Sequence, residues 1–429
     1  MRKNKLLLLS LFIGLMLGTS PAKAVEQAND NAEAYRLLNL FADTLEQTKK
    51  SYVEEVTDKK LIEAAINGML TSLDPHSSYL DAESFTYMNE QTKGKFGGLG
   101  IEVTMDNGLV KVVSPIDDTP AAKAGIKAGD YITNIDGETV IGLNLNEAVS
   151  KLRGKIGTKV KLSIRRANSK PIEMTIKRQE IKIQSVKSEI KEDSVNYIRI
   201  SSFTEDIDKV ISESISQAKK KLKNKLLGIV IDVRNNPGGL LDQAIAVSDL
   251  FLDKGEIVST RSRNESDTSK VMATAGDIAR GLPIVVIINE GSASASEILA
   301  GALQDHHRAI ILGEKSFGKG SVQTVIPLGD YGAMRLTTAR YYTPSGRSIQ
   351  AKGIEPDIEV KPAKVEELDS YALNISEAEL NNALKNDSDI DAKKTEKSKK
   401  SKEDLADYQL TRALDLVKAL ALYSSLEEK

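Results

Sequence analysis

The sequence predicts a multidomain α+β protein whose largest part is an α/β domain with a largely parallel sheet. Strands and helices alternate from Tyr197 to Val360, which is typical of such a domain. Residues 96 to about 178 instead carry short alternating strands and little helix, which is typical of a compact, mostly β module. The 429 residues are enough for two or three domains with buried cores.

The α/β part is organised around the stretch from Pro283 to Gln323. Its β-branched run Ile284 to Ile288 predicts a buried strand, and a Ser/Ala/Gly cluster then opens an apolar-periodic helix. The expected elements before it are a strand over 197–200, a helix over 207–223, a strand over 227–233 and a helix over 240–251. The strand over 227–233 ends in Arg234-Asn-Asn-Pro-Gly-Gly239, and loops at strand carboxyl ends are where ligands bind in open α/β sheets.

The mostly β module begins with Phe96-Gly-Gly-Leu-Gly-Ile101, where glycines before a strand can turn backbone N–H groups inward to bind a carboxylate. A peptide C-terminus could dock there by adding a strand, although the glycines alone favour an ordinary turn. The strands are expected over 101–104, 109–113, 131–135, 160–165 and 172–177, with short helices over 121–124 and 146–152.

The two ends of the chain have distinct compositions. Arg2, Lys3 and Lys5 precede an apolar run, Leu6 to Leu17, and Ala22-Lys-Ala24 fits an export-signal cleavage site. We expect a helical segment next, with a helix start capped by Thr57. At the other end, residues 385–404 read as a polar linker and 405–423 as a final helix that packs on the body or on another subunit.

Composition excludes several classes of function. The formal net charge of −2, without a basic stripe, argues against a nucleic-acid partner. Because the chain contains no cysteine, it can have no disulfide, thiol nucleophile or zinc–thiolate site.

Three serines, Ser292, Ser294 and Ser296, lie at the turn into the central helix, and Lys319 follows between two glycines. A hydroxyl at a helix start together with a lysine is the material of a serine nucleophile with an amine base. The residues alone do not choose among the three serines.

Two other classes of active site are compatible with parts of the same stretch. Gly313 to Gly320 nearly matches a phosphate-binding loop, but Gly320 replaces the hydroxyl residue, and a strand is expected where that loop needs a helix. A Ser-His-Asp triad with His306 or His307 fails because about 12 helical residues, on the order of 18 Å, separate them from the serines. Only His76, in the turn signal Asp74-Pro-His-Ser, could still complete a triad, although a lone histidine in a turn is more typical of a structural residue. An exported scaffold without catalytic activity would account for the β module alone.

The β module resembles a PDZ domain. The resemblance rests on Gly98-Leu-Gly-Ile101, Ser114-Pro115, Pro120-Ala121, Ala124-Gly-Ile-Lys-Ala-Gly-Asp130 and Ile135-Asp-Gly137. It implies a groove, lined by Gly98, Leu99, Gly100 and Ile101, that binds peptide tails.

Most of the chain resembles the carboxyl-terminal processing peptidases, a family of serine endopeptidases with an inserted PDZ domain. The motifs are Asn235-Asn-Pro-Gly-Gly239, Gly291-Ser-Ala-Ser-Ala-Ser-Glu-Ile298, Gly318-Lys-Gly-Ser-Val-Gln323, Tyr342-Thr-Pro-Ser-Gly346 and Asp407-Tyr-Gln-Leu-Thr-Arg-Ala-Leu414. The resemblance implies a core similar to the ClpP/crotonase-like fold.

The same resemblance implies a Ser/Lys dyad, with Ser294 as nucleophile and Lys319, 25 residues later (319 − 294), as base. Gln323 would orient the lysine, and the oxyanion hole would come from backbone N–H groups of Ala295 and of Gly239 or Gly238. No cofactor or metal is implied, and the expected partners are protein or peptide substrates bound by their C-terminal tails.

The predicted organisation is a signal peptide (1–24), an N-terminal helical segment (25–95), a PDZ domain (96–180), a serine protease core (181–365), a polar linker (366–404) and a C-terminal helix (405–429). We expect export to the periplasm or to the outer face of the inner membrane. Peripheral membrane association and homo-oligomerisation stay open.

Overall fold

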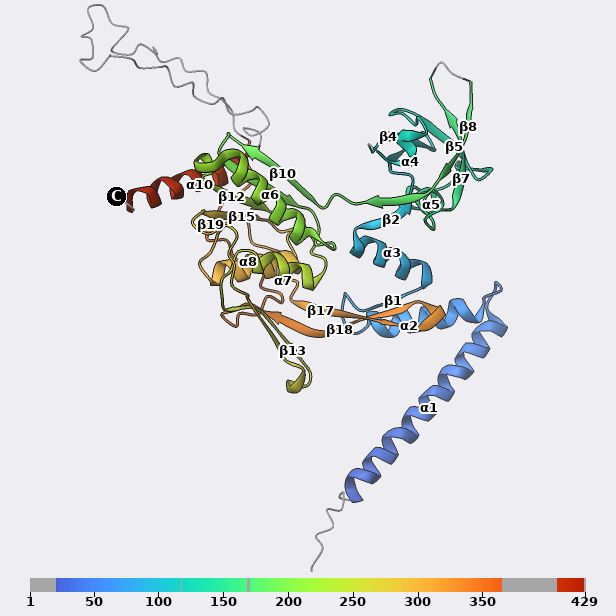
Figure 1. The fold of residues 1–429 in the computed structure, drawn as a ribbon. Coiled ribbons are helices and arrows are strands. Elements are labelled where there is room, and N and C mark those ends of the chain that lie inside the picture. The colour runs from blue at the N-terminus through green and yellow to red at the C-terminus, as the bar shows by residue number, and fades with distance from the viewer. Residues whose placement is uncertain (1–20, 117, 168–169, 365–406, 428–429) are drawn as a thin grey trace, which may run out of the picture. The chain divides into compact units, whose positions relative to one another are not determined.

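The computed structural model describes residues 21–116, 118–167, 170–364 and 407–427 (Figure 1). The chain divides into two compact units, Met1–Tyr79 and Leu80–Lys429, with the short strand β1 (Ser78–Leu80) at the boundary. Most of the predicted signal peptide and all of the predicted polar linker lie outside the described residues. Within the described ranges, no helix has the length and apolar character needed to cross a membrane.

The N-terminal unit contains α1 (Pro21–Ser51) and α2 (Asp58–Thr71). The predicted cap is confirmed, because the side chain of Thr57 accepts a hydrogen bond from the backbone N–H of Lys60 at 3.3 Å. The predicted turn is also present: Asp74 accepts hydrogen bonds from the backbone N–H groups of His76 (2.8 Å) and Ser77 (3.0 Å).

The mostly β module forms an antiparallel sheet in the order β3-β4-β5-β7-β8, with β6 paired to β5. Alternate residues of its strands, among them Val110, Val112, Leu162 and Ile164, are fully buried in one core, as the alternating sequence pattern predicts. The elements are β3 (Ile101–Asp106), β4 (Leu109–Pro115), α4 (Pro120–Lys123), β5 (Tyr131–Ile135), β6 (Glu138–Thr139), α5 (Leu145–Leu152), β7 (Lys159–Arg165) and β8 (Ile172–Lys177).

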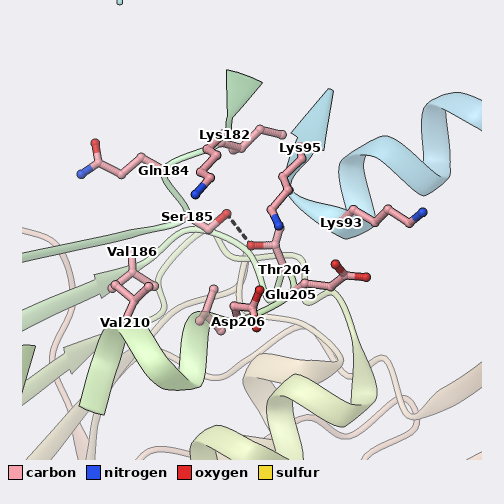
Figure 2. A pocket seen from close by; sticks show the side chains of 13 residues that line it. Lys93, Lys95, Lys182, Gln184, Ser185, Val186, Thr204, Glu205, Asp206 and Val210 are labelled. Carbon is pink, nitrogen blue, oxygen red and sulfur yellow. Dashed lines mark hydrogen bonds between the residues drawn. The ribbon is translucent and has the colours of Figure 1, made fainter. Parts of the chain in front are cut away.

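A two-stranded ribbon, β2 (Lys95–Gly98) with β9 (Gln179–Lys182), joins this module to the rest, and α3 (Ala82–Lys93) leads into it. Figure 2 shows the pocket of about 320 Å³ beside the ribbon, with Lys95 and Lys182 near the hydrogen-bonded side chains of Ser185 and Thr204. This pocket includes none of the predicted catalytic residues.

The α/β core contains a sheet of order β10-β11-β12-β15-β16-β19, in which every pair after β10 is parallel. Figure 1 shows its strands and helices in the alternation that the sequence predicts. The elements are β10 (Val186–Lys191), β11 (Val195–Ile200), α6 (Ile207–Leu222), the short 3₁₀ turn η1 (Lys223–Lys225), β12 (Gly228–Asp232), α7 (Leu241–Asp249), β15 (Ile284–Ile288), α8 (Ala295–Asp305), β16 (Ile310–Gly313) and β19 (Ile358–Glu359).

Helices cover both faces of this sheet, which explains why β12 and β15 are buried along their whole length. Ile229 and Ile231 of β12 belong to the core that also holds residues of α6, α7 and α8. Val230, between them, packs instead with the last helix, α10 (Tyr408–Glu427), drawn in red in Figure 1. Of the two predicted positions for the final helix, the structure therefore shows packing on the body.

A second sheet flanks the core and contains β13, β14, β17 and β18. Its strands are β13 (Glu256–Ser262), β14 (Ser269–Met272), β17 (Ser321–Pro327) and β18 (Ala333–Tyr342), and short 3₁₀ turns lie at η2 (Glu265–Asp267) and η3 (Gly329–Tyr331). Strand β17 begins two residues after Lys319, as predicted, so the lysine lies in a loop between two sheets.

Candidate active site

Ser294 occupies a strained turn between β15 and α8. Its backbone angles are φ 55° and ψ −110°, a region that non-glycine residues rarely adopt. Strain of this kind gathers at functional sites, and a sharp strand-to-helix turn is the way in which hydrolases expose a nucleophilic serine.

The three serines of this turn have different environments. Ser292 and Ser296 are fully buried, and their hydroxyl groups donate to backbone carbonyls, of Val233 at 2.8 Å and of Asn236 at 3.0 Å. Ser294 is partly exposed, and no hydrogen bond among the described residues uses its hydroxyl as donor. The geometry therefore leaves Ser294 as the serine with an accessible hydroxyl.

The glycine loop after β12 lies directly against this turn. Ala293 donates its backbone N–H to the carbonyl of Asn236 at 2.9 Å, and a Cβ atom at position 238 would lie 2.9 Å from the Cβ of Ser294. The N–H of Gly238 is occupied, because it donates to the Asn236 side chain at 2.9 Å. The N–H groups of Gly239 and Ala295 have no hydrogen-bond partner among the residues the structure describes, so they remain able to donate.

Glu297, which the sequence interpretation did not single out, connects the predicted nucleophile and the predicted base. Its fully buried carboxylate accepts hydrogen bonds from the backbone N–H groups of Ser294 (2.7 Å), Gly318 (2.6 Å) and Lys319 (2.9 Å) and from the hydroxyl of Ser316 (2.6 Å). Burial raises the pKa of Glu297, although these hydrogen bonds act in the opposite direction. The one available sequence signal was its position three residues into a helix, which is typical of a capping box.

Lys319 has the partly buried environment that lowers the pKa of an amine base, although none of the hydrogen bonds in the described part of the chain joins its amine to the Ser294 hydroxyl. It is partly buried, and burial lowers the pKa of its amine from the ordinary 10.5. The positive charge of Arg335 on β18 lowers this pKa further, while the Glu297 carboxylate raises it. The balance favours a neutral amine at lower pH than for a free lysine.

Gln323 lies on β17, four residues after Lys319. Its side-chain amide donates to the Ser321 hydroxyl at 2.9 Å and to the Thr337 hydroxyl at 3.4 Å. Since none of the hydrogen bonds in the described part of the chain joins Gln323 to Lys319, its orienting role stays a prediction.

His306 and Asp305 have structural contacts. The His306 ring is hydrogen bonded through Nε2 to the carbonyl of Glu256 at 2.7 Å. Asp305, at the end of α8, accepts hydrogen bonds from the Ser345 N–H at 2.9 Å and from Arg347 at 2.5 Å. It anchors the loop after β18.

The four predicted peptide-binding residues of the β module line one groove. A cavity of about 190 Å³ between β3 and α5 is bounded by Gly98, Leu99, Gly100 and Ile101 and, from α5, by Val149 and Leu152. The backbone N–H groups of Leu99 and Gly100 have no hydrogen-bond partner among the described residues, which is the property a carboxylate site requires.

The fold and site together define a class: a serine peptidase with a grooved, mostly β module joined to an α/β core. Comparison with known proteins agrees. Residues 194–360 match the model of peptidase family S41, residues 97–178 that of the PDZ domain, and residues 15–84 that of the activating protease CtpB N-terminal domain.

Relatives place the chain more closely. It is 54% identical over 365 residues to a carboxy-terminal-processing protease of Bartonella bacilliformis, covering 85% of this chain and 84% of the relative. It is 39% identical to the carboxy-terminal processing protease CtpA of Bacillus subtilis, covering 82% and 74%. A solved structure, the photosystem II D1 C-terminal processing protease, is 30% identical with a TM-score of 0.45, covering 74% and 86%. The chain belongs to peptidase family S41 and is a carboxy-terminal processing serine protease with a PDZ domain.

Proposed function

We propose that this protease cleaves peptide bonds with Ser294 as nucleophile and Lys319 as general base, on substrates whose C-terminal tails bind the PDZ groove. The observation that carries the proposal is the shared carboxylate of Glu297. One oxygen, Oε2, accepts the backbone N–H groups of both Ser294 and Lys319, so the two residues are tied together although they are far apart in sequence.

The reaction follows from the properties of these groups. The neutral amine of Lys319 takes the hydroxyl proton as Ser294 Oγ attacks the substrate carbonyl carbon. The C–N bond then breaks, and the leaving amine receives the proton from the lysine ammonium. Water hydrolyses the resulting acyl-enzyme by the same route, which releases a new carboxylate and regenerates the serine.

The negative charge on the carbonyl oxygen needs hydrogen-bond donors. We assign this task to the backbone N–H groups of Gly239 and Ala295, because both are uncommitted among the described residues. Gly238 is the weaker candidate since its N–H already serves the Asn236 side chain. Its lack of a side chain instead permits the close approach to Ser294.

Two measurements test the proposal. The purified protein is labelled with a fluorophosphonate probe and the labelled residue is identified by mass spectrometry. In parallel, cleavage of a peptide that carries an apolar C-terminal tail is measured. We expect the label on Ser294 and no label after Ser294→Ala. Labelling at Ser292 or Ser296, or cleavage that persists in Lys319→Ala, would contradict the dyad.

We also propose that the chain is exported to the periplasm or to the outer face of the inner membrane. The basic n-region, the apolar run Leu6 to Leu17 and the small residues at Ala22 and Ala24 support this. N-terminal sequencing of the protein from an envelope fraction should begin near Val25. Peripheral membrane attachment and self-association are further proposals. Vesicle flotation tests the first, and light scattering tests the second.

A further inference from the structure

The glycine loop that follows β12 begins with an arginine held by two carboxylates. Arg234 donates from Nη2 to Asp232 at 2.6 Å and to Asp407 at 2.6 Å, and from Nη1 to Asp407 at 2.9 Å. Its Nε adds two hydrogen bonds to Asp232, at 3.0 and 3.2 Å. The Arg234 side chain is 15% exposed and that of Asp232 is 2% exposed, so solvent screens this pair little, whereas the Asp407 side chain is 35% exposed.

Asp407 comes from the other end of the chain and is fixed by its own helix. It lies directly before α10, where its Oδ1 accepts the N–H of Leu410 at 3.1 Å and so caps the helix. Gln409 adds an acceptor for Arg234 at 3.1 Å and donates to the carbonyl of Val360 at 2.7 Å. Buried apolar residues of α10 hold the helix on the sheet: Leu410, Ala413, Leu414 and Val417.

The loop after Arg234 leads to the site within a few residues. Asn235 donates its N–H to the Asn289 side chain at 2.7 Å, and Asn236 accepts from Ala293, next to the nucleophile, at 2.9 Å. Gly239 closes the loop, bridged to Phe203. A displacement of Arg234 would therefore also move the backbone N–H of Gly239, the proposed oxyanion donor.

We propose that Asp407 is a positioning residue for the peptidase reaction: by holding Arg234 it fixes the loop that presents the N–H of Gly239, which makes α10 part of the catalytic unit. The inference rests on the function proposed above for Ser294 and Gly239. Burial opposes the charge of Arg234, but the hydrogen bonds that it donates to Asp407 and Asp232 outweigh burial and raise its pKa, so the guanidinium stays charged. Without Asp407, Arg234 keeps only the Asp232 carboxylate, which Arg199 also contacts at 3.3 Å, and it loses the two hydrogen bonds that fix its other end.

Two substitutions separate the contact to Arg234 from the helix cap. Asp407→Asn and Asp407→Ser both retain a good N-cap residue, but the first loses the charge and the second cannot reach Arg234. Asp407→Glu keeps the charge. The matched control is Asp277→Asn, which breaks the part-buried ion pair of Asp277 with Arg308 (2.8 Å) in the same core.

The experiment measures kcat and KM for the tailed peptide, the rate of fluorophosphonate labelling and the melting midpoint, at a temperature where every variant is folded. We expect the Asn and Ser variants to lose at least about tenfold in kcat and in labelling rate, with KM nearly unchanged, because an oxyanion donor acts in the transition state. Asp407→Glu should recover much of the rate. Asp277→Asn should lower the melting midpoint without this loss.

The outcomes separate the two proposals. If the unmodified protein is not labelled at Ser294, the proposed function fails and the role of Asp407 fails with it. If Ser294 is labelled and the Asn and Ser variants react as fast as the unmodified protein, only the role of Asp407 is overturned. A loss of kcat in the control equal to that in Asp407→Asn also overturns it, because the effect would then be general destabilisation.

Discussion

Glu297 and Lys319 are joined through the backbone: Oε2 of Glu297 accepts the N–H of Lys319 at 2.9 Å while it also accepts the N–H of Ser294 at 2.7 Å. One buried carboxylate thus holds together the backbone segments that carry the two halves of the proposed dyad. This arrangement makes Glu297 as important to test as the dyad itself.

We expect Glu297→Gln to lower kcat by about 100-fold, because a small misplacement of reacting groups can cost that much. A carboxamide accepts hydrogen bonds only at its oxygen, because its nitrogen is a donor. Some of the four hydrogen bonds that the carboxylate accepts would therefore be lost. Asp357→Asn is the control, since Asp357 also accepts a backbone N–H, that of Ile311, at 2.8 Å. Steady-state cleavage of the tailed peptide decides, and equal kcat in both variants would refute the expectation.

Substitution of the three serines should separate catalysis from packing. Ser294→Ala should abolish turnover with a free energy of unfolding within about 0.5 kcal/mol of the unmodified protein, as for other substitutions outside the core. Ser292→Ala should cost about 1–3 kcal/mol, because the buried carbonyl of Val233 loses its hydroxyl donor. Denaturant unfolding and peptide cleavage together check this, and turnover by Ser294→Ala is the outcome that would contradict it.

Arg335→Gln should move the acid limb of the pH profile of kcat/KM to higher pH. The positive charge of Arg335 disfavours the ammonium and so lowers the pKa of Lys319, and its removal lets that pKa rise towards 10.5. More alkaline solution is then needed to produce the neutral base. Arg340→Gln, on the same strand, is the control and should leave the profile in place. A shift to lower pH would have the wrong sign.

Gly239→Ala should be more damaging than Gly276→Ala, although both glycines have nearly the same positive φ (147° and 146°). A Cβ at 239 would lie 2.3 Å from the carbonyl oxygen of Phe203, whereas a Cβ at 276 meets nothing within 4 Å. The backbone strain from the positive φ is common to both variants. The difference in kcat between them therefore measures the effect of displacing the loop that contains residue 239. We expect a loss in kcat of about 100-fold or more for Gly239→Ala alone, the scale of one oxyanion donor.

Amidation of the substrate's C-terminus should weaken binding at the PDZ groove. A carboxylate can accept from the uncommitted N–H groups of Leu99 and Gly100, and an amide loses the charge that strengthens those bonds. Competition binding and cleavage of matched free-acid and amidated peptides measure the effect, which we expect as a rise in KM. Equal turnover of the two peptides would remove the groove from substrate selection.

The architecture was largely predictable because it follows from local patterns. The run Ile284 to Ile288 is β-branched throughout and forms a strand with those same bounds, buried on both faces. The module after Phe96 has the alternation that an antiparallel sheet imposes, and its strands appear close to the expected positions. By contrast, α3 lies within the segment 25–95 that was expected to be helical but was not predicted as a separate helix, because its sequence AESFTYMNEQTK has few apolar residues and leaves none of them buried.

By itself the sequence determined the fold class, the glycine loops, the cluster of three serines and Lys319, since each is a property of consecutive residues. The choice among the serines was open to the residues alone and came only from the family resemblance. The tertiary structure supplies a physical reason: Val233 and Asn236, some 60 residues earlier, occupy the hydroxyls of Ser292 and Ser296. The same holds for Asp407, whose contact with Arg234 spans 173 residues. Contacts between segments so far apart leave no periodic trace in the sequence, and only folding brings these groups within hydrogen-bond distance.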